Sequence, residues 1–127
     1  MTRWLAMMVL LMLAVTVVAE NDEVVLARVI DSSLERVPLQ TIAPEYPRKA
    51  RRDRIEGEVQ VCFEVDRKGR PRRVAVRHSS DRVFEKPSLK AVKASRFRPL
   101  GKEEPLQAIK SCRTFIFALE PVDPSEY

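Results

Sequence analysis

Acidic side chains, one histidine and two adjacent serines are the residues of this chain that acid–base or nucleophilic chemistry could use. Glu58 and Glu64 share one face of a predicted strand, but their spacing along a strand is roughly 20 Å, too far for a pair of catalytic carboxylates. His78 is followed by Ser79 and Ser80, which we interpret as a strand end. The chain has neither a Gly-rich phosphate loop nor a nucleophile motif. The sequence therefore predicts that the protein is not an enzyme.

The two cysteines, Cys62 and Cys112, are the next candidates for chemistry. An even number of cysteines in an exported chain favours a disulfide. The single histidine, His78, has no spacing from either cysteine that resembles a zinc site. We therefore predict no metal site and no cofactor.

The N-terminus indicates export. Thr2 and Arg3 lead into an apolar run from Trp4 to Val18, and Ala19 completes a small-residue cleavage pattern before a polar stretch. The run is about 15 residues long, shorter than the roughly 20 that span a bilayer. We interpret residues 1–19 as a cleaved signal peptide, with a retained short signal anchor as the alternative. In both cases the body of the protein lies outside the cytoplasm.

Composition limits the body to one domain. The chain has 127 residues, of which 45% are hydrophobic and 32% charged, with a net charge of +5. Its two Tyr and five Phe are too few to interleave a basic patch with stacking aromatics, so we predict no nucleic-acid binding. A solvated basic face, or attraction to acidic lipid or an acidic partner, accounts for the charge.

Hydrophobic periodicity gives the order of elements in the body. Residues 20–30 could form a short strand or an irregular lead-in, and the prolines at 38, 44 and 47 keep the next stretch extended. Alternation predicts strands, and a 3.6-residue pattern predicts helices. The expected elements are a short helix at 48–52, a strand at 58–65, a turn at 66–69 with Gly69 at positive φ, a strand at 73–78, a helix at 84–97 and a strand at 109–119.

This order predicts an α+β fold with a small antiparallel three-stranded sheet. A helix that crosses back over a hairpin places the last strand beside the first strand of that hairpin. The expected order is therefore second, first, third, and the third strand is an edge. Cys62 and Cys112 both point away from the helix-covered face of neighbouring strands. A cross-strand disulfide is expected from this parity, the alternative being two free thiols at the sheet surface.

An ordered set of short motifs resembles the C-terminal domain of TonB. It begins with Pro44-Glu45-Tyr46-Pro47 and continues through Arg54-Ile55-Glu56-Gly57-Glu58-Val59 and Phe63-Glu64-Val65-Asp66 with Gly69. It goes on through Ser79-Ser80, Phe84, Leu89, Arg96-Phe97-Arg98-Pro99 and the strand Phe115 to Leu119. The resemblance covers about residues 40–120. It implies two helices packed on one face of the small sheet, with residues 20–39 as a linker or lead-in and 121–127 as a flexible tail.

The resemblance also implies a function. TonB couples a proton-driven inner-membrane motor to outer-membrane transporters, whose N-terminal box adds as a strand to the last strand of the domain. The residues implied as the partner-binding edge are Arg113, Thr114, Phe115, Ile116, Phe117 and Ala118. Unpaired N–H and C=O groups on an edge strand form a template for such addition. Judged without the resemblance, the same residues are an ordinary edge strand protected by Arg113 and the acidic tail.

The motif Pro44-Glu45-Tyr46-Pro47 has two interpretations. From the residues alone, Tyr46 is a core aromatic that fixes the chain as it enters the first helix. By resemblance, residues just before Tyr46 also touch the transporter box, although Ala43 stands where well-known transducers have glutamine. A second departure is Ser95, because the family often has tryptophan before Arg-Phe.

Two functions stay open at the level of sequence. The first is an exported TonB-like protein that binds an outer-membrane TonB-dependent transporter in energy-coupled transport. The second is a stand-alone periplasmic interaction or scaffold module without energy coupling. A full transducer carries a long proline-rich linker, whereas residues 20–39 reach roughly 70 Å when fully extended. Contact with inner-membrane motor proteins requires a retained N-terminal anchor, and a homodimer formed by edge pairing is a further option.

Overall fold

The computed structural model describes residues 23–32, 34 and 36–121. The expected signal segment 1–19 lies outside the described residues, as does the expected tail 121–127 apart from Pro121. The elements in chain order are β1 (Glu23–Ser32), β2 (Pro38–Gln40), α1 (Arg48–Arg52), β3 (Gly57–Val65), β4 (Pro71–Ser79), a 3₁₀ turn η1 (Arg82–Phe84), α2 (Glu85–Ala94), β5 (Arg96–Phe97) and β6 (Ser111–Pro121). No helix in the described ranges is long and apolar enough to cross a membrane.

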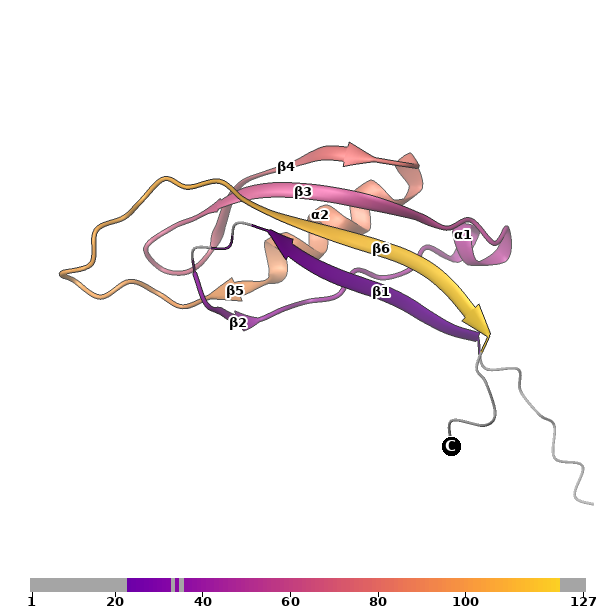
Figure 1. Cartoon of the computed structure of the whole chain (residues 1–127), viewed down its shortest axis with the longest axis horizontal. Helices are drawn as coiled ribbons and strands as arrows, with labels where there is room; N and C mark the ends of the chain where they lie inside the picture. Colours follow the sequence, from indigo (N-terminus) through magenta and orange to yellow (C-terminus); the bar gives the residue numbers. More distant parts are fainter. Residues whose placement is uncertain (1–22, 33, 35, 122–127) are drawn as a thin grey trace, which may run out of the picture.

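The main sheet has four strands, in the order β1-β6-β3-β4, and every neighbouring pair is antiparallel. The predicted order of three strands is confirmed by β4-β3-β6. The prediction of only three strands is wrong, because β1 pairs along the outer side of β6 (Figure 1). β2 and β5 form a separate two-stranded pair. Much of the stretch expected as a linker therefore belongs to the folded domain.

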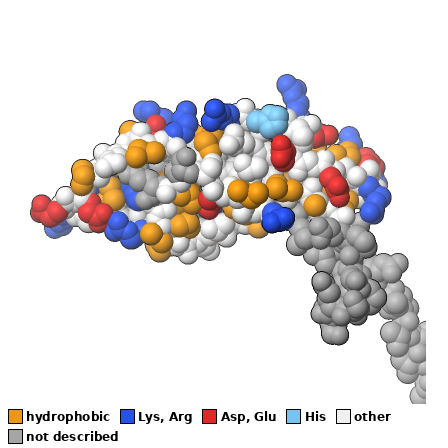
Figure 2. All heavy atoms as spheres, in the orientation of Figure 1, with side chains coloured by type: hydrophobic (Ala, Val, Ile, Leu, Met, Phe, Trp, Pro, Cys, Tyr) orange, Lys and Arg blue, Asp and Glu red, His pale blue; other side chains and the backbone are white. Residues whose placement is uncertain are grey.

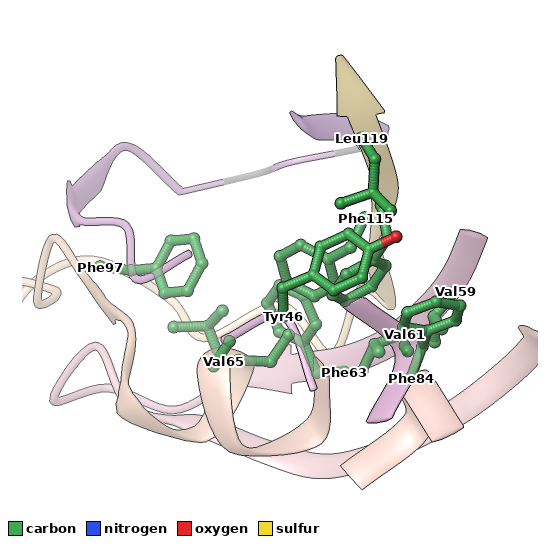
Figure 3. Close-up of a cluster of buried hydrophobic side chains, with 13 residues drawn as sticks. Tyr46, Val59, Val61, Phe63, Val65, Phe84, Phe97, Phe115 and Leu119 are labelled. Carbon is green, nitrogen blue, oxygen red and sulfur yellow. The ribbon is translucent and has the colours of Figure 1, made fainter. Parts of the chain in front are cut away.

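Alternating apolar residues build the core from both central strands. Val59, Val61 and Phe63 from β3 are fully buried, as are Phe115 and Phe117 from β6, to within 1% exposure. α2 packs across β3 and β4 and adds Ala91 and Val92 to the same cluster. Ala50 of α1 is also a member of that cluster. Figure 3 shows this cluster in close-up, with Tyr46 among the labelled side chains of Val59, Val61, Phe63 and Phe115.

The helix expected over residues 84–97 is shorter than its pattern suggests, because α2 ends at Ala94. Ser95 is extended, with φ −72° and ψ 155°, and its hydroxyl donates to the carbonyl of Ala91. The chain then turns so that Phe97 packs 5.6 Å from Phe63, measured between ring centroids. Burying Phe97 in the core outweighs one further helical turn, since an aromatic side chain gains far more from burial than a helix-end residue gains from propensity.

β4 is the irregular edge of the sheet. Its register against β3 shifts twice, between Gln60 and Val61 and between Cys62 and Glu64. At the second shift Arg73 adopts a φ of 52°, the left-handed conformation typical of a bulge. Bulges, a leading proline and outward arginines are the devices that keep an edge strand from pairing. β4 is thus an edge strand that is protected against pairing with another strand.

Candidate functional site

Backbone groups of β6 are the surface that strand addition would use, and their directions follow from the disulfide. Cys62 and Cys112 are bonded and lie directly opposite each other, with their Cα atoms 4.1 Å apart. That separation is typical of a pair that exchanges no backbone hydrogen bonds. The N–H and C=O of Cys112 therefore point away from β3, toward β1. With no register shift along β6, the same direction holds for Thr114, Ile116 and Ala118.

The other end of β6 agrees with this alternation. The N–H of Leu119 points to the β3 side, where it donates to a carboxylate oxygen of Glu56 at 2.8 Å. This bond continues the ladder one step beyond the pairing of Phe117 with Gly57. Odd-numbered residues of β6 thus bond toward β3 and even-numbered residues toward the outer edge.

The predicted cross-strand disulfide is confirmed, since Cys62 and Cys112 are bonded and lie on the adjacent strands β3 and β6. Their side chains are 5% and 7% exposed, so the bond is buried. It ties β3 to β6 at the end of β6 where the strand begins.

The six residues expected to form the binding edge fall into two sets. Arg113, Phe115 and Phe117 face the core and are at most 1% exposed. Thr114, Ile116 and Ala118 face the opposite side and are half-buried. β6 therefore presents its side chains to the two faces of the sheet, and only its backbone faces the outer edge.

The expectation that this outer edge is open is wrong, because β1 occupies it. β1 pairs with β6 over ten positions, from Glu23 opposite Pro121 to Ser32 opposite Cys112. The sequence carried a signal for this strand, namely the apolar positions around Val29 and the acid Asp31. The pattern was ambiguous because only Val29, of the side chains described in β1, packs against the core. Backbone pairing with β6 and, among the described side chains, an ion pair stabilise β1.

That ion pair joins Asp31 to Arg113. The guanidinium of Arg113 is completely buried and donates from Nε and Nη2 to the two carboxylate oxygens of Asp31, the latter at 3.1 Å. It also lies 3.4 Å from the Ser95 hydroxyl and 5.5 Å from the centroid of the Phe97 ring. Bidentate pairing of this kind is the strongest geometry for arginine and carboxylate. Sequence reasoning placed Arg113 at the edge but missed Asp31 as its partner.

The Tyr-Pro motif lies on the core side of β6. Tyr46 is 6% exposed, and its ring packs edge-on against Phe84 and Phe117, with centroids 5.6 and 5.5 Å away. Its hydroxyl donates to the carbonyl of Ile55. Glu45 is exposed, while Pro44 is buried. The motif acts as the expected core anchor and brings its exposed residue near α2, where it lines a shallow pocket of about 240 Å³ with Ala43 and Lys90.

The chain between β1 and β2 is fixed by Arg36. This side chain is 7% exposed and donates to the carbonyl of Arg98 at 2.7 Å and to that of Asp66 at 2.9 Å. It thus joins the β3–β4 turn to the segment that follows β5. These hydrogen bonds attach the chain to the rest of the domain only four residues after the end of β1.

Outside β6, the shifted pKa values arise from hydrogen bonds and ion pairs with nearby residues. A hydrogen-bonded ion pair with Arg98 lowers the pKa of Glu104 to about 2 and raises the pKa of Arg98. Burial raises the pKa of Asp66. Hydrogen bonds from Arg70, Arg72 and Lys68 together lower it by more, so the pKa lies below its usual value. Lys and Arg side chains are scattered among acidic and apolar ones on the face in Figure 2. Within residues 23–32, 34 and 36–121, no cluster of three or more His, Cys, Asp or Glu side chains could hold a metal ion.

Comparison with known proteins was consistent with this arrangement. The model of the Gram-negative bacterial TonB protein C-terminal family matches residues 42–119. The structure is similar to the solution NMR structure of the Pseudomonas aeruginosa TonB CTD, with 29% sequence identity and a TM-score of 0.55. That similarity covers 68% of this chain and 88% of the other. No curated protein matches. Because the family model spans more than half of the chain, the protein belongs to the TonB C-terminal domain family.

Proposed function

We propose that this is an exported TonB-like protein that binds an outer-membrane TonB-dependent transporter by strand addition, within energy-coupled transport. One observation carries the proposal. The outer edge of β6 accepts a strand over ten registered positions, and that strand, β1, lies before the family match at residues 42–119. The edge is therefore competent for the antiparallel pairing that β-augmentation uses. No catalytic role is assigned.

The groups that would carry the binding are the backbone N–H and C=O of Thr114, Ile116 and Ala118. Their directions, argued above from the 4.1 Å Cα spacing at the disulfide, face the outer edge. Arg113, Phe115 and Phe117 support them from the core. The motif Pro44-Glu45-Tyr46-Pro47 would contribute indirectly, because Tyr46 packs on Phe117.

Proline substitution tests this assignment. Thr114→Pro and Ile116→Pro each remove one outward N–H and leave the bonds to β3 in place, so we expect at least a tenfold loss of affinity for a peptide with the N-terminal segment of a transporter. Thr114→Val is the matched control, because it keeps the N–H and should keep the affinity. Calorimetry measures binding, and circular dichroism checks the fold. Unchanged affinity in folded proline variants would rule out binding at the β6 edge.

The second candidate is a periplasmic interaction module without energy coupling. The pairing of Glu23–Ser32 with β6 favours it, because a strand incorporated in the sheet is not available as a spacer. The N-terminal residue of the protein isolated from cells separates the two. A start at Glu20 means a free periplasmic domain that cannot transmit force from the inner membrane. A start at Met1 or Thr2 means an anchored protein, and contact with the motor proteins then belongs to the proposal.

A further inference from the structure

The main sheet ends in β4 on one side and in β1 on the other, and β1 covers β6. β4 is guarded by two register shifts and by Pro71 at its start. β6 is regular along its whole paired length, and only β1 covers it. A regular strand with ten registered positions is the better template for a partner, and a partner that pairs with β6 has to replace β1.

The side chains that the structure describes in β1, those of residues 28–32, make few contacts that hold the strand in place. Arg28, Ile30, Asp31 and Ser32 are exposed by residue, and Ile30 retains 48% of its accessible surface. The Ser32 hydroxyl lies 3.4 Å from the carbonyl of Cys112, a weak contact. Among the described side chains of this strand, the bidentate pair of Asp31 with Arg113 is the strongest contact.

With β1 in place, the guanidinium of Arg113 is fully buried, and besides Asp31 it contacts the Ser95 hydroxyl and the Phe97 ring. A strand that takes the place of β1 covers this guanidinium again. Burying the charge without a carboxylate beside it is strongly unfavourable. An incoming strand that supplies a carboxylate at the same position removes that penalty, and one that does not supply it leaves the penalty in full.

We infer that β1 is an internal occupant of the partner site, and that Arg113 selects incoming strands with Asp or Glu in the position of Asp31. The inference rests on the proposed strand addition and specifies the partner: an extended segment with an acidic side chain facing Arg113 and an apolar one in the place of Val29, which lies opposite Phe115. Arg113 acts as a specificity-determining residue, and Asp31 is the group that a partner replaces.

Hydrogen exchange in the full chain tests the occupancy. In Asp31→Asn, the amides of Thr114, Ile116 and Ala118 should exchange at least tenfold faster than in the wild type. The amides of Arg113, Phe115 and Phe117, which face β3, should change little. Arg28→Gln is the matched control, since Arg28 lies on the same strand, is exposed and is placed opposite Ile116. Equal exchange in Asp31→Asn and wild type, or equal acceleration of all six amides, would overturn the inference.

A pair of peptides tests the selectivity. The peptide of residues 23–32 and its variant with Asn at the position of Asp31 are titrated into the Asp31→Asn chain. We expect the aspartate peptide to bind at least tenfold more tightly. Both peptides should bind the wild type more weakly, because its tethered β1 keeps the aspartate and competes more strongly for β6. Equal affinities of the two peptides would show that Arg113 does not select.

A transporter N-terminal peptide with an acidic residue separates this inference from the proposed function. If it binds the Asp31→Asn chain better than the wild type, both are supported. If the exchange and peptide results hold but the transporter peptide binds neither chain, the transporter assignment fails and the acid-selective edge stands. If it binds both chains equally without changing exchange at Thr114, the partner adds elsewhere, and the inference fails while transporter binding stands.

Discussion

At the scale of single residues, the core is anchored by contacts that the sequence motif alone could only suggest. Tyr46 was expected in the core as the aromatic that fixes the chain where it enters the first helix, and its ring packs against Phe84 and Phe117. Its hydroxyl adds a bond to the Ile55 carbonyl that no pattern predicts. Propensity and spacing identify which residues are buried, whereas the partner of a polar atom depends on the folded path of distant segments.

Tyr46→Phe removes that hydroxyl and leaves the Ile55 carbonyl without its donor. The variant should lower the free energy of unfolding by about 1–2 kcal/mol, measured by urea denaturation. Tyr46→Ala also removes the ring and should cost about 3–5 kcal/mol. If Tyr46→Phe is as stable as the wild type, the hydroxyl contributes nothing.

Gly69 fulfils a backbone requirement that the sequence identified in advance. Its φ is 83°, as expected for the turn after β3. A Cβ there would also meet the carbonyl oxygen of Phe97 at 2.0 Å. We expect Gly69→Ala to destabilise the fold by about 1–3 kcal/mol.

Gly101→Ala is the control for that change, because its Cβ would meet only the flexible side chain of Glu104, at 3.4 Å. Its effect should stay within about 0.5 kcal/mol of zero. Thermal unfolding of the two variants under the same buffer gives the comparison. Similar losses in both would contradict the account of Gly69.

The pKa of Glu104 gives a prediction with a defined direction. Hydrogen bonding to Arg98 lowers it from 4.5 to about 2. A lowered folded-state pKa means that the contribution of this pair is present above about pH 4.5 and is lost as the pH falls toward 2. An NMR titration of the Glu104 carboxyl should show a midpoint near 2. In Arg98→Gln the midpoint should move up toward 4.5, and an unchanged midpoint would show that Arg98 is not the cause.

At the scale of elements, the strands were predictable where one face is buried and less so where pairing alone holds them. β3 and β6 alternate apolar residues toward a helix-covered face, so their presence and their order followed from the sequence. β1 has no such face in its described side chains, and its strand character depends on the edge that β6 offers. The edge assignment failed for that reason: the covering strand came from a segment with an ambiguous pattern.

The disulfide joins β3 to β6 and can be removed without changing the alternation of apolar residues in either strand. It closes a loop of 50 residues, which in the chain-entropy model is a stabilisation of about 4 kcal/mol. Replacing both cysteines with alanine should lower the free energy of unfolding by up to that amount, measured by urea denaturation. Reduction of the wild type with dithiothreitol should give a similar loss, and no loss in either would contradict a structural role.

At the scale of the whole molecule, the family domain and its N-terminal strand are separable in principle. Among the described side chains of β1, Val29 alone packs against the core cluster, and it is partly buried. A chain that begins at Leu34 should therefore keep the fold but expose the regular outer edge of β6. We expect it to self-associate with rising concentration, measured by sedimentation equilibrium, while the full chain stays monomeric under the same conditions. A truncated chain that remains monomeric would show that the uncovered edge does not pair with itself.

The position of the ion pair along β1 has a mechanical consequence. A pull on the N-terminus of an anchored chain would act first on the pair Glu23 and Pro121. β1 would then separate from β6 one residue pair at a time. Asp31 and Arg113 lie near the opposite end and would separate among the last. Separation frees roughly 33 Å of already extended backbone, while Arg36 still fastens the chain to the domain. Tension would thus uncover the edge of β6 before it could disturb the core.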